Sequence, residues 1–147
     1  MPFYQLVNEQ QVEIVVAGPG DINRHYVCKG LAMGNFSVNV GQGYVSQNDT
    51  WQFEVGPQLD STQFRRAIAT VGFAGLTEER GTPQQAGTGN INWAIQTVFA
   101  DFDDDAGKVR VSVTNLITLN SLGPGGESAG ENMLSYDVSI LAAVTGA

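Results

Sequence analysis

Cysteine, histidine and lysine are nearly absent from this sequence. Its 147 residues include one cysteine, one histidine and two lysines. A single cysteine cannot form a disulfide within the chain, so the core has to stabilise the fold. Cys28 and His25 are three residues apart, a separation that places them on opposite faces of a strand. We therefore expect a buried thiol beside a surface histidine and not a nucleophilic pair. Without a set of acid, base and nucleophile we expect no enzyme, no catalytic residues and no cofactor.

Basic charge and long apolar runs are also scarce. Seven Lys and Arg residues against fifteen Asp and Glu residues give a net charge of -8. This balance disfavours nucleic acid as a partner, because few cations are present to neutralise phosphates. No run approaches the roughly 20 apolar residues of a membrane-spanning helix, so we expect no membrane insertion. The first residues lack the basic region and long apolar segment of a secretory signal.

The surface has to be covered largely by uncharged polar groups. Charged residues make up 15% of the chain, while Asn, Gln, Ser and Thr contribute 39 residues and Gly 18. Amides and hydroxyls suit a surface that binds polyols or another subunit, and lysine is depleted at interfaces. The composition therefore resembles that of extracellular or virion proteins, favours a homo-oligomer, and leaves the compartment open.

Alternation of apolar and polar residues with period two dominates the chain and predicts β-strands. Gly and Asn separate the alternating runs, and no segment of ten residues has helical periodicity. Residues 60–68 could hold a single helical turn behind a Ser or Asp cap. We predict an all-β single domain over residues 1–147, an antiparallel β-sandwich of about seven to eight strands. The predicted runs are residues 12–16, 36–40, 51–55, 67–73, 93–99, 109–113 and 134–140, with an eighth at 26–31.

The apolar side of the later runs should form the core. Trp51 and Trp93 could each stack on a sugar ring, but their apolar neighbours on the same face favour a place in the core. The residues expected to be mostly buried are Trp93, Ile95, Phe99, Val109, Val111, Val113, Tyr136, Val138 and Ile140.

Two long connections rich in Gly, Pro and polar residues should separate the later strands. They cover residues 77–92 and 120–132. Structureless loops of this length are uncommon in compact domains and are usually functional or mobile. The glycines of the second loop do not indicate a phosphate-binding loop, because no Gly-Lys-Ser/Thr follows them.

The densest charge cluster is the aspartate run Asp101, Asp103, Asp104 and Asp105. Alternating aspartates before a glycine are typical of calcium loops, but Gly107 comes one place late for an EF-hand and the final glutamate is missing. A hairpin turn over residues 104–107 explains the pattern more simply, because Asp tolerates turn conformations and Gly supplies a positive φ. We therefore predict a turn and no metal site. Carboxylates on a hairpin tip also make a poor glycosidase pair.

The strands RRAIATVGFAGL, NWAIQTVFADF, KVRVSVTNL and YDVSILAAV give residues 64–147 a resemblance to the H-type lectin family. Members of that family are small β-sandwiches that form trimers or hexamers and bind N-acetylgalactosamine-type sugars. The resemblance lies in apolar spacing, so no sugar-contacting residue can be transferred to this chain. Residues 1–56 contribute N-terminal strands outside the lectin-like portion.

Two classes of function remain after these exclusions. The amide-rich surface, the long loops and the lectin-like pattern favour a non-enzymatic binding module for glycans or another polar surface, with its ligand-binding residues unknown. Low lysine content and glycine-rich loops equally suit a structural protein, such as a phage, fibre or filament subunit. A closed small oligomer would favour the first class and an open-ended polymer the second.

Overall fold

The computed structural model describes residues 4–15, 22–40, 43–80, 88–121 and 126–143. These residues form seven antiparallel strands and no helix, which confirms the predicted all-β class. In this described part of the chain no helix has the length and apolar character to span a membrane. The strands are β1 (Tyr4–Val15), β2 (Arg24–Val40), β3 (Gly43–Val55), β4 (Phe64–Arg80), β5 (Thr88–Asp103), β6 (Lys108–Ser121) and β7 (Gly126–Ala142).

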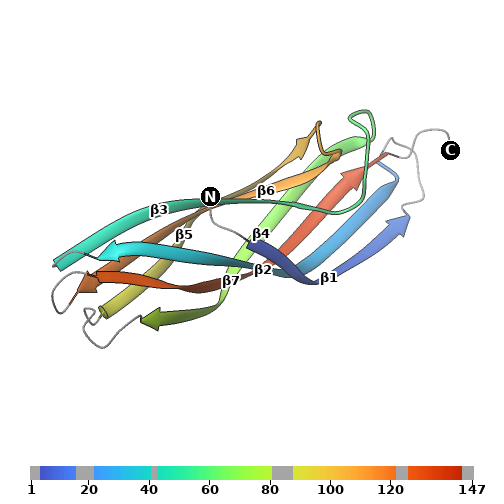
Figure 1. Cartoon of the computed structure of the whole chain (residues 1–147). Coiled ribbons are helices and arrows are strands. Elements are labelled where there is room, and N and C mark those ends of the chain that lie inside the picture. Colours follow the sequence, from blue (N-terminus) through green and yellow to red (C-terminus); the bar gives the residue numbers. More distant parts are fainter. Residues whose placement is uncertain (1–3, 16–21, 41–42, 81–87, 122–125, 144–147) are drawn as a thin grey trace.

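The strands build two sheets, consistent with a β-sandwich. One sheet has the order β1-β2-β7-β4 and the other the order β3-β6-β5. Figure 1 shows long twisted strands that run the length of the molecule. Strands from residues 1–56 are hydrogen-bonded to strands from residues 64–147 in both sheets, because β2 pairs with β7 and β3 pairs with β6.

The core lies between the sheets and is formed by alternate side chains of the central strands and of β3. Trp51 and Leu134 are fully buried, and an aromatic contact joins Phe53 to Tyr136 with ring centroids 5.2 Å apart. Six of the residues expected in the core are buried, and Trp93 and Ile95 pack against it while half-buried. The six are Val109, Val111, Val113, Tyr136, Val138 and Ile140.

Gly34 makes room for the largest side chain of this core. A Cβ atom built on Gly34 would lie 2.5 Å from the ring of Trp51. No Cβ atom tolerates so short a distance to a ring atom that is itself enclosed, so a larger residue here would displace the indole. Because Gly34 of β2 has no side chain, the indole of Trp51 from β3 fits against it.

Several expected boundaries are wrong because the strands are longer than their clearest alternating segments. The predicted runs 26–31 and 36–40 are parts of one 17-residue strand, β2. The loops expected at residues 77–92 and 120–132 are largely strand, since β4 extends to Arg80 and β7 begins at Gly126. The remaining connections, residues 81–87 and 122–125, lie outside the described part of the chain.

The single turn expected within residues 60–68 is present at residues 60–63 behind an Asp cap, as a hydrogen-bonded turn and not as a helix. The backbone carbonyl of Asp60 accepts a hydrogen bond from the N–H of Gln63 at 3.0 Å, and its carboxylate accepts one from the N–H of Thr62 at 3.0 Å. Strand β4 then begins at Phe64. Asp60 therefore caps a single turn, as its residue type suggested, and β-structure resumes directly afterwards.

Irregular pairing interrupts three of the four edge strands in the described part of the sheets. The register shifts between Val7 and Gln10 in β1, between Phe73 and Gly75 in β4, and between Ile95 and Thr97 in β5. Each shift is a β-bulge, which adds an unpaired residue and changes which later side chains face inward.

The bulge in β5 explains why one core assignment was wrong. Phe99 was expected inside with Trp93 and Ile95, but its side chain is 59% exposed. The unpaired Gln96 shifts the alternation by one residue, so Val98 and Ala100 pack against the core instead. Phe99 consequently lies on the outer face of the three-stranded sheet.

Candidate functional site

The outer face of the three-stranded sheet carries a regular array of polar side chains. Gln52, Ser112 and Phe99 lie side by side across β3, β6 and β5, because Ser112 pairs with both of the others. Their backbone neighbours Phe53, Val111 and Val113 are buried on the opposite side, which fixes the outward direction. The adjacent row consists of Glu54, Arg110 and Asp101.

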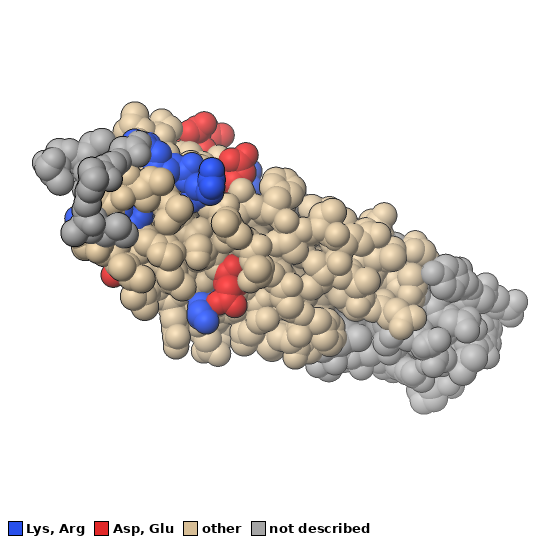
Figure 2. Space-filling model, turned by 180° about the vertical axis from the view of Figure 1, so that it is seen from behind, with Lys and Arg blue, Asp and Glu red and all other residues tan. Residues whose placement is uncertain are grey.

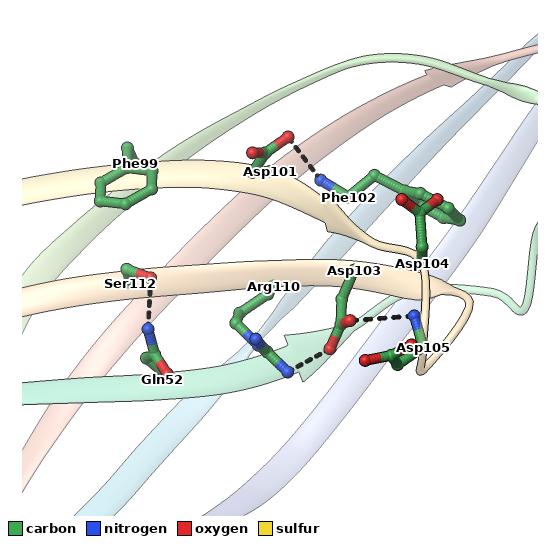
Figure 3. Close-up of a pocket in the computed structure, with 9 residues that line it drawn as sticks. All are labelled: Gln52, Phe99, Asp101, Phe102, Asp103, Asp104, Asp105, Arg110 and Ser112. Carbon is green, nitrogen blue, oxygen red and sulfur yellow. Dashed lines mark hydrogen bonds and ion pairs between the residues drawn. The ribbon is translucent and has the colours of Figure 1, made fainter. Parts of the chain in front are cut away.

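Phe99 is the one large exposed apolar side chain of this face within the described residues. Its neighbour Ser112 is bonded to Gln52, whose amide donates to the Ser112 hydroxyl at 3.4 Å. Figure 3 shows the ring of Phe99 beside Ser112, with Asp101 further along the same strand. An apolar ring surrounded by a hydroxyl, an amide and carboxylates presents a flat stacking surface beside hydrogen-bonding groups.

These residues line an open hollow of about 480 Å³. The turn between β5 and β6 closes one end of the hollow, and the sheet surface forms its floor (Figure 3). Its volume falls within the range of about 300–1,000 Å³ typical of small-molecule sites. The lining residues are Gln52, Phe99, Asp101, Phe102, Asp103, Asp104, Asp105, Arg110 and Ser112.

Arg110 is held in place by two carboxylates. Its guanidinium donates to Glu54 Oε1 at 3.1 Å and to the carboxylate of Asp103. Partial burial of Asp103 acts to raise the pKa of its carboxyl. A hydrogen bond from the N–H of Asp105 and the charge of Arg110 outweigh that effect, and the pKa lies below its ordinary value. The site therefore keeps a fixed, charge-compensated Arg110 at neutral pH.

The aspartate run forms the hairpin turn that its sequence predicted. Strand β5 ends at Asp103, residues 104–107 turn, and β6 begins at Lys108. Gly107 has a φ of 67°, and its N–H donates to the carbonyl of Asp103 at 2.8 Å. The carboxylate of Asp101 accepts a hydrogen bond from the N–H of Phe102, and that of Asp103 accepts one from the N–H of Asp105. Both carboxylates therefore already have hydrogen-bond donors within the protein.

The described residues contain no cluster of metal-binding side chains. No three His, Cys, Asp or Glu residues of this part come together in a way that could hold a metal ion. Within the turn, Asp104 points away from the Asp103–Arg110 pair in Figure 3. The insensitivity of the protein to metal removal remains a prediction.

The structure separates the two residues of the Cys28–His25 pair. Cys28 is 4% exposed and belongs to the core, and burial raises the pKa of its thiol to about 11. His25 lies on the other face of β2, since its strand neighbour Tyr26 is buried. The thiol stays protonated at neutral pH, and the imidazole is not beside it.

Both tryptophans also have the core positions that were favoured for them. Trp51 is fully buried, and Trp93 packs edge-on against it with ring centroids 6.3 Å apart. The Trp93 indole N–H donates to Asn115 Oδ1 at 3.0 Å, which satisfies its polar atom inside the sandwich. Neither ring lines the hollow, so the aromatic residue of the site is Phe99.

Phe99 was missed because two alternating patterns overlap within one strand. Residues 93 and 95 are apolar at odd positions, whereas 98, 100 and 102 are apolar at even positions. A regular strand cannot bury both sets, and a one-residue bulge between them resolves the conflict. The polar Thr97 at an expected inward position is the signal that could have located the bulge.

Charge is concentrated around the turn that closes the hollow. In Figure 2, most charged residues of the side shown gather towards one end, one pair of opposite charges lies near the middle, and the rest of the described surface is uncharged.

Comparison with protein-family models, curated proteins and solved structures found no match. The function therefore has to be inferred from the geometry of the site itself.

Proposed function

We propose that this protein is a non-enzymatic binding module that recognises glycans on the outer face of its three-stranded sheet. The observation that carries the proposal is Phe99, an exposed ring on a polar sheet face at the floor of a hollow. The apolar face of a pyranose ring stacks on such a side chain. The hydroxyls of that ring bond to exposed neighbouring groups such as Gln52 and Asp101.

The charge of the site restricts the class of glycan. Arg110 is already paired with Glu54 and Asp103, while Asp101, Asp104 and Asp105 are exposed carboxylates around the hollow. The chain as a whole carries a net charge of -8. Sialylated, sulfated and uronic-acid glycans would be repelled, so the proposed ligands are neutral or N-acetylated sugars.

The test is a glycan array followed by calorimetric titration of the best neutral ligand. Phe99→Ala should weaken binding by about tenfold to a hundredfold, because it removes the stacking surface. Phe73→Ala is the matched control, since Phe73 is 53% exposed on β4 and lies outside the hollow. Equal losses in both variants, or no binding of any neutral glycan by the parent protein, would refute the proposal.

A structural or assembly role is the second candidate. It is favoured by the outer face of the four-stranded sheet, where Val12 is 58% and Ile68 is 61% exposed. Exposed apolar residues on one sheet face are typical of surfaces that contact other protein subunits. Solution mass separates the candidates, because a filament subunit forms open-ended polymers whereas a binding module stops at a closed oligomer.

A further inference from the structure

The outer face of the four-stranded sheet carries exposed apolar side chains beside polar ones in the half nearest the C-terminal end of β7. Register places Val12, Val27, Ser139 and Ile68 in one row across β1, β2, β7 and β4. The neighbouring residues Tyr26, Val138 and Ile140 are buried, so this row points away from the core. The next row contains Ile14, 45% exposed, with His25, Leu141 and Arg66.

An ion pair occupies the centre of this face. Lys29 Nζ lies 3.1 Å from Asp137 Oδ1, and the two side chains are 62% and 54% exposed. Lys29 belongs to β2 and Asp137 to β7, the two central strands of the sheet. The pair contributes no net charge, on a chain whose net charge is -8. Two copies that approach through this face therefore experience no net repulsion from its central pair.

We propose that a second copy of this chain packs on this face in a two-fold symmetric dimer. The axis would lie in the interface and run between β2 and β7, parallel to the strands. This operation places Lys29 opposite the partner's Asp137 and Val12 opposite the partner's Ile68. The ion pair and the row of Val12 and Ile68 are thus each complementary to their counterparts, as an isologous interface requires, while Arg66 comes to lie opposite the partner's Ile14.

The area of the face is sufficient for a stable dimer. Four strands about 4.8 Å apart and about ten residues long, at ~3.3 Å per residue, cover roughly 600 Å² on each copy. The two copies together would bury roughly 1,200 Å², which exceeds the ~1,000 Å² expected of a specific interface. Sheets packed face to face in this way keep their strands within about 30° of each other.

The edges of the sheets are less suitable for association than this face. Bulges interrupt β1, β4 and β5 in the described part of the chain, and a bulge breaks the ladder that an added strand would have to continue. Self-association by strand addition is therefore disfavoured at these three edges, while β3 is paired without a register shift. The proposed dimer is independent of the glycan proposal and leaves both candidate hollows exposed on its two outer sides.

The first test measures mass in solution by light scattering and sedimentation. The parent protein should be a dimer at micromolar concentration. Ile68→Asp should weaken the dimer by tenfold or more. Phe99→Asp also replaces an apolar side chain by aspartate, at a site of nearly equal exposure on the other sheet, and should leave the dimer intact. A monomeric parent, an open-ended polymer, or an equal response of the two variants would overturn the proposal.

The second test uses the central ion pair and does not depend on the folding of the Ile68 variant. Lys29→Asp gives a face with two negative charges, and Asp137→Lys gives a face with two positive charges. Each variant alone should dimerise at least about tenfold more weakly than the parent, and an equimolar mixture should recover a dimer that contains one copy of each. Single variants that dimerise like the parent, or a mixture that stays monomeric, would contradict the proposed axis.

Discussion

The two outer faces of the sandwich cover the same core but differ in almost every property. The three-stranded sheet presents Gln52, Asp101 and Arg110 around one exposed aromatic ring, Phe99. The four-stranded sheet presents Val12 and Ile68 around one exposed ion pair. The inward residues of each strand are constrained by packing, whereas the outward residues are free to serve separate contacts. The difference is what our two proposals rest on, a small polar ligand for one face and a second copy of the chain for the other.

The largest expected effect is on the free energy of unfolding, which should respond strongly to truncation in the shared core and weakly on an outer face. Ile140→Ala should lower the free energy of unfolding by about 2–5 kcal/mol, because Ile140 is fully buried. Ile68→Ala, the same substitution in the same sheet at a site 61% exposed, should change it by less than ~0.5 kcal/mol in the monomer. Urea unfolding at low protein concentration measures both. Similar losses in the two variants would show that the inward and outward faces of β4 or β7 are wrongly assigned.

A smaller effect on stability, dependent on pH, is expected from Asp103 at the charged end of the polar face. The folded protein lowers the pKa of Asp103, so ionised Asp103 stabilises the fold at neutral pH. This contribution is complete above the carboxyl's ordinary pKa and is lost as pH falls through the lowered value. Asp103→Asn should therefore reduce stability at pH 7 and flatten its decline under acid conditions. Urea titrations over that range would contradict the assignment if the parent and the variant declined in parallel.

The smallest expected effect concerns metal. Chelator treatment should leave the melting temperature unchanged, because the carboxylates of Asp101 and Asp103 already accept backbone hydrogen bonds and Asp103 pairs with Arg110. A micromolar calcium site would instead stabilise the protein by about 4 kcal/mol at millimolar calcium. Differential scanning calorimetry with and without calcium decides between them. A rise that Asp103→Asn abolishes would make the turn part of a calcium-dependent binding site.

The fold was predictable from sequence because each strand contains at least one strictly alternating segment. Val109, Val111 and Val113 indicated both a strand and its buried side, and Gly107 indicated the turn before it. The extent of the strands was less predictable. Gly126 and its polar neighbours have the composition of a loop, yet they pair with β2, because long-range hydrogen bonding outweighs local propensity.

The candidate site was not predictable, because its aromatic residue depends on a change of alternation within β5. The same limit applies elsewhere on the edge strands. Val12 and Ile14 share a face, as expected, but register turns that face outward. Phe73 continues the pattern of Ala69 and Val71, yet its ring is 53% exposed. Alternation identifies which side chains share a face, but only the pairing partners determine whether that face is covered.

The bulge at Gln96 is also a position at which β5 could lose one residue. Ile95 faces the core and Thr97 faces outward, and their partners Asn115 and Thr114 are consecutive residues of β6. Deleting Gln96 would thus straighten β5 and leave each remaining side chain on its present face. Related sequences that are one residue shorter at this position would keep both the core and the Phe99 surface. A sequence alignment without a gap at this position would mismatch one half of the strand, and the similarity between such sequences and this chain would be missed.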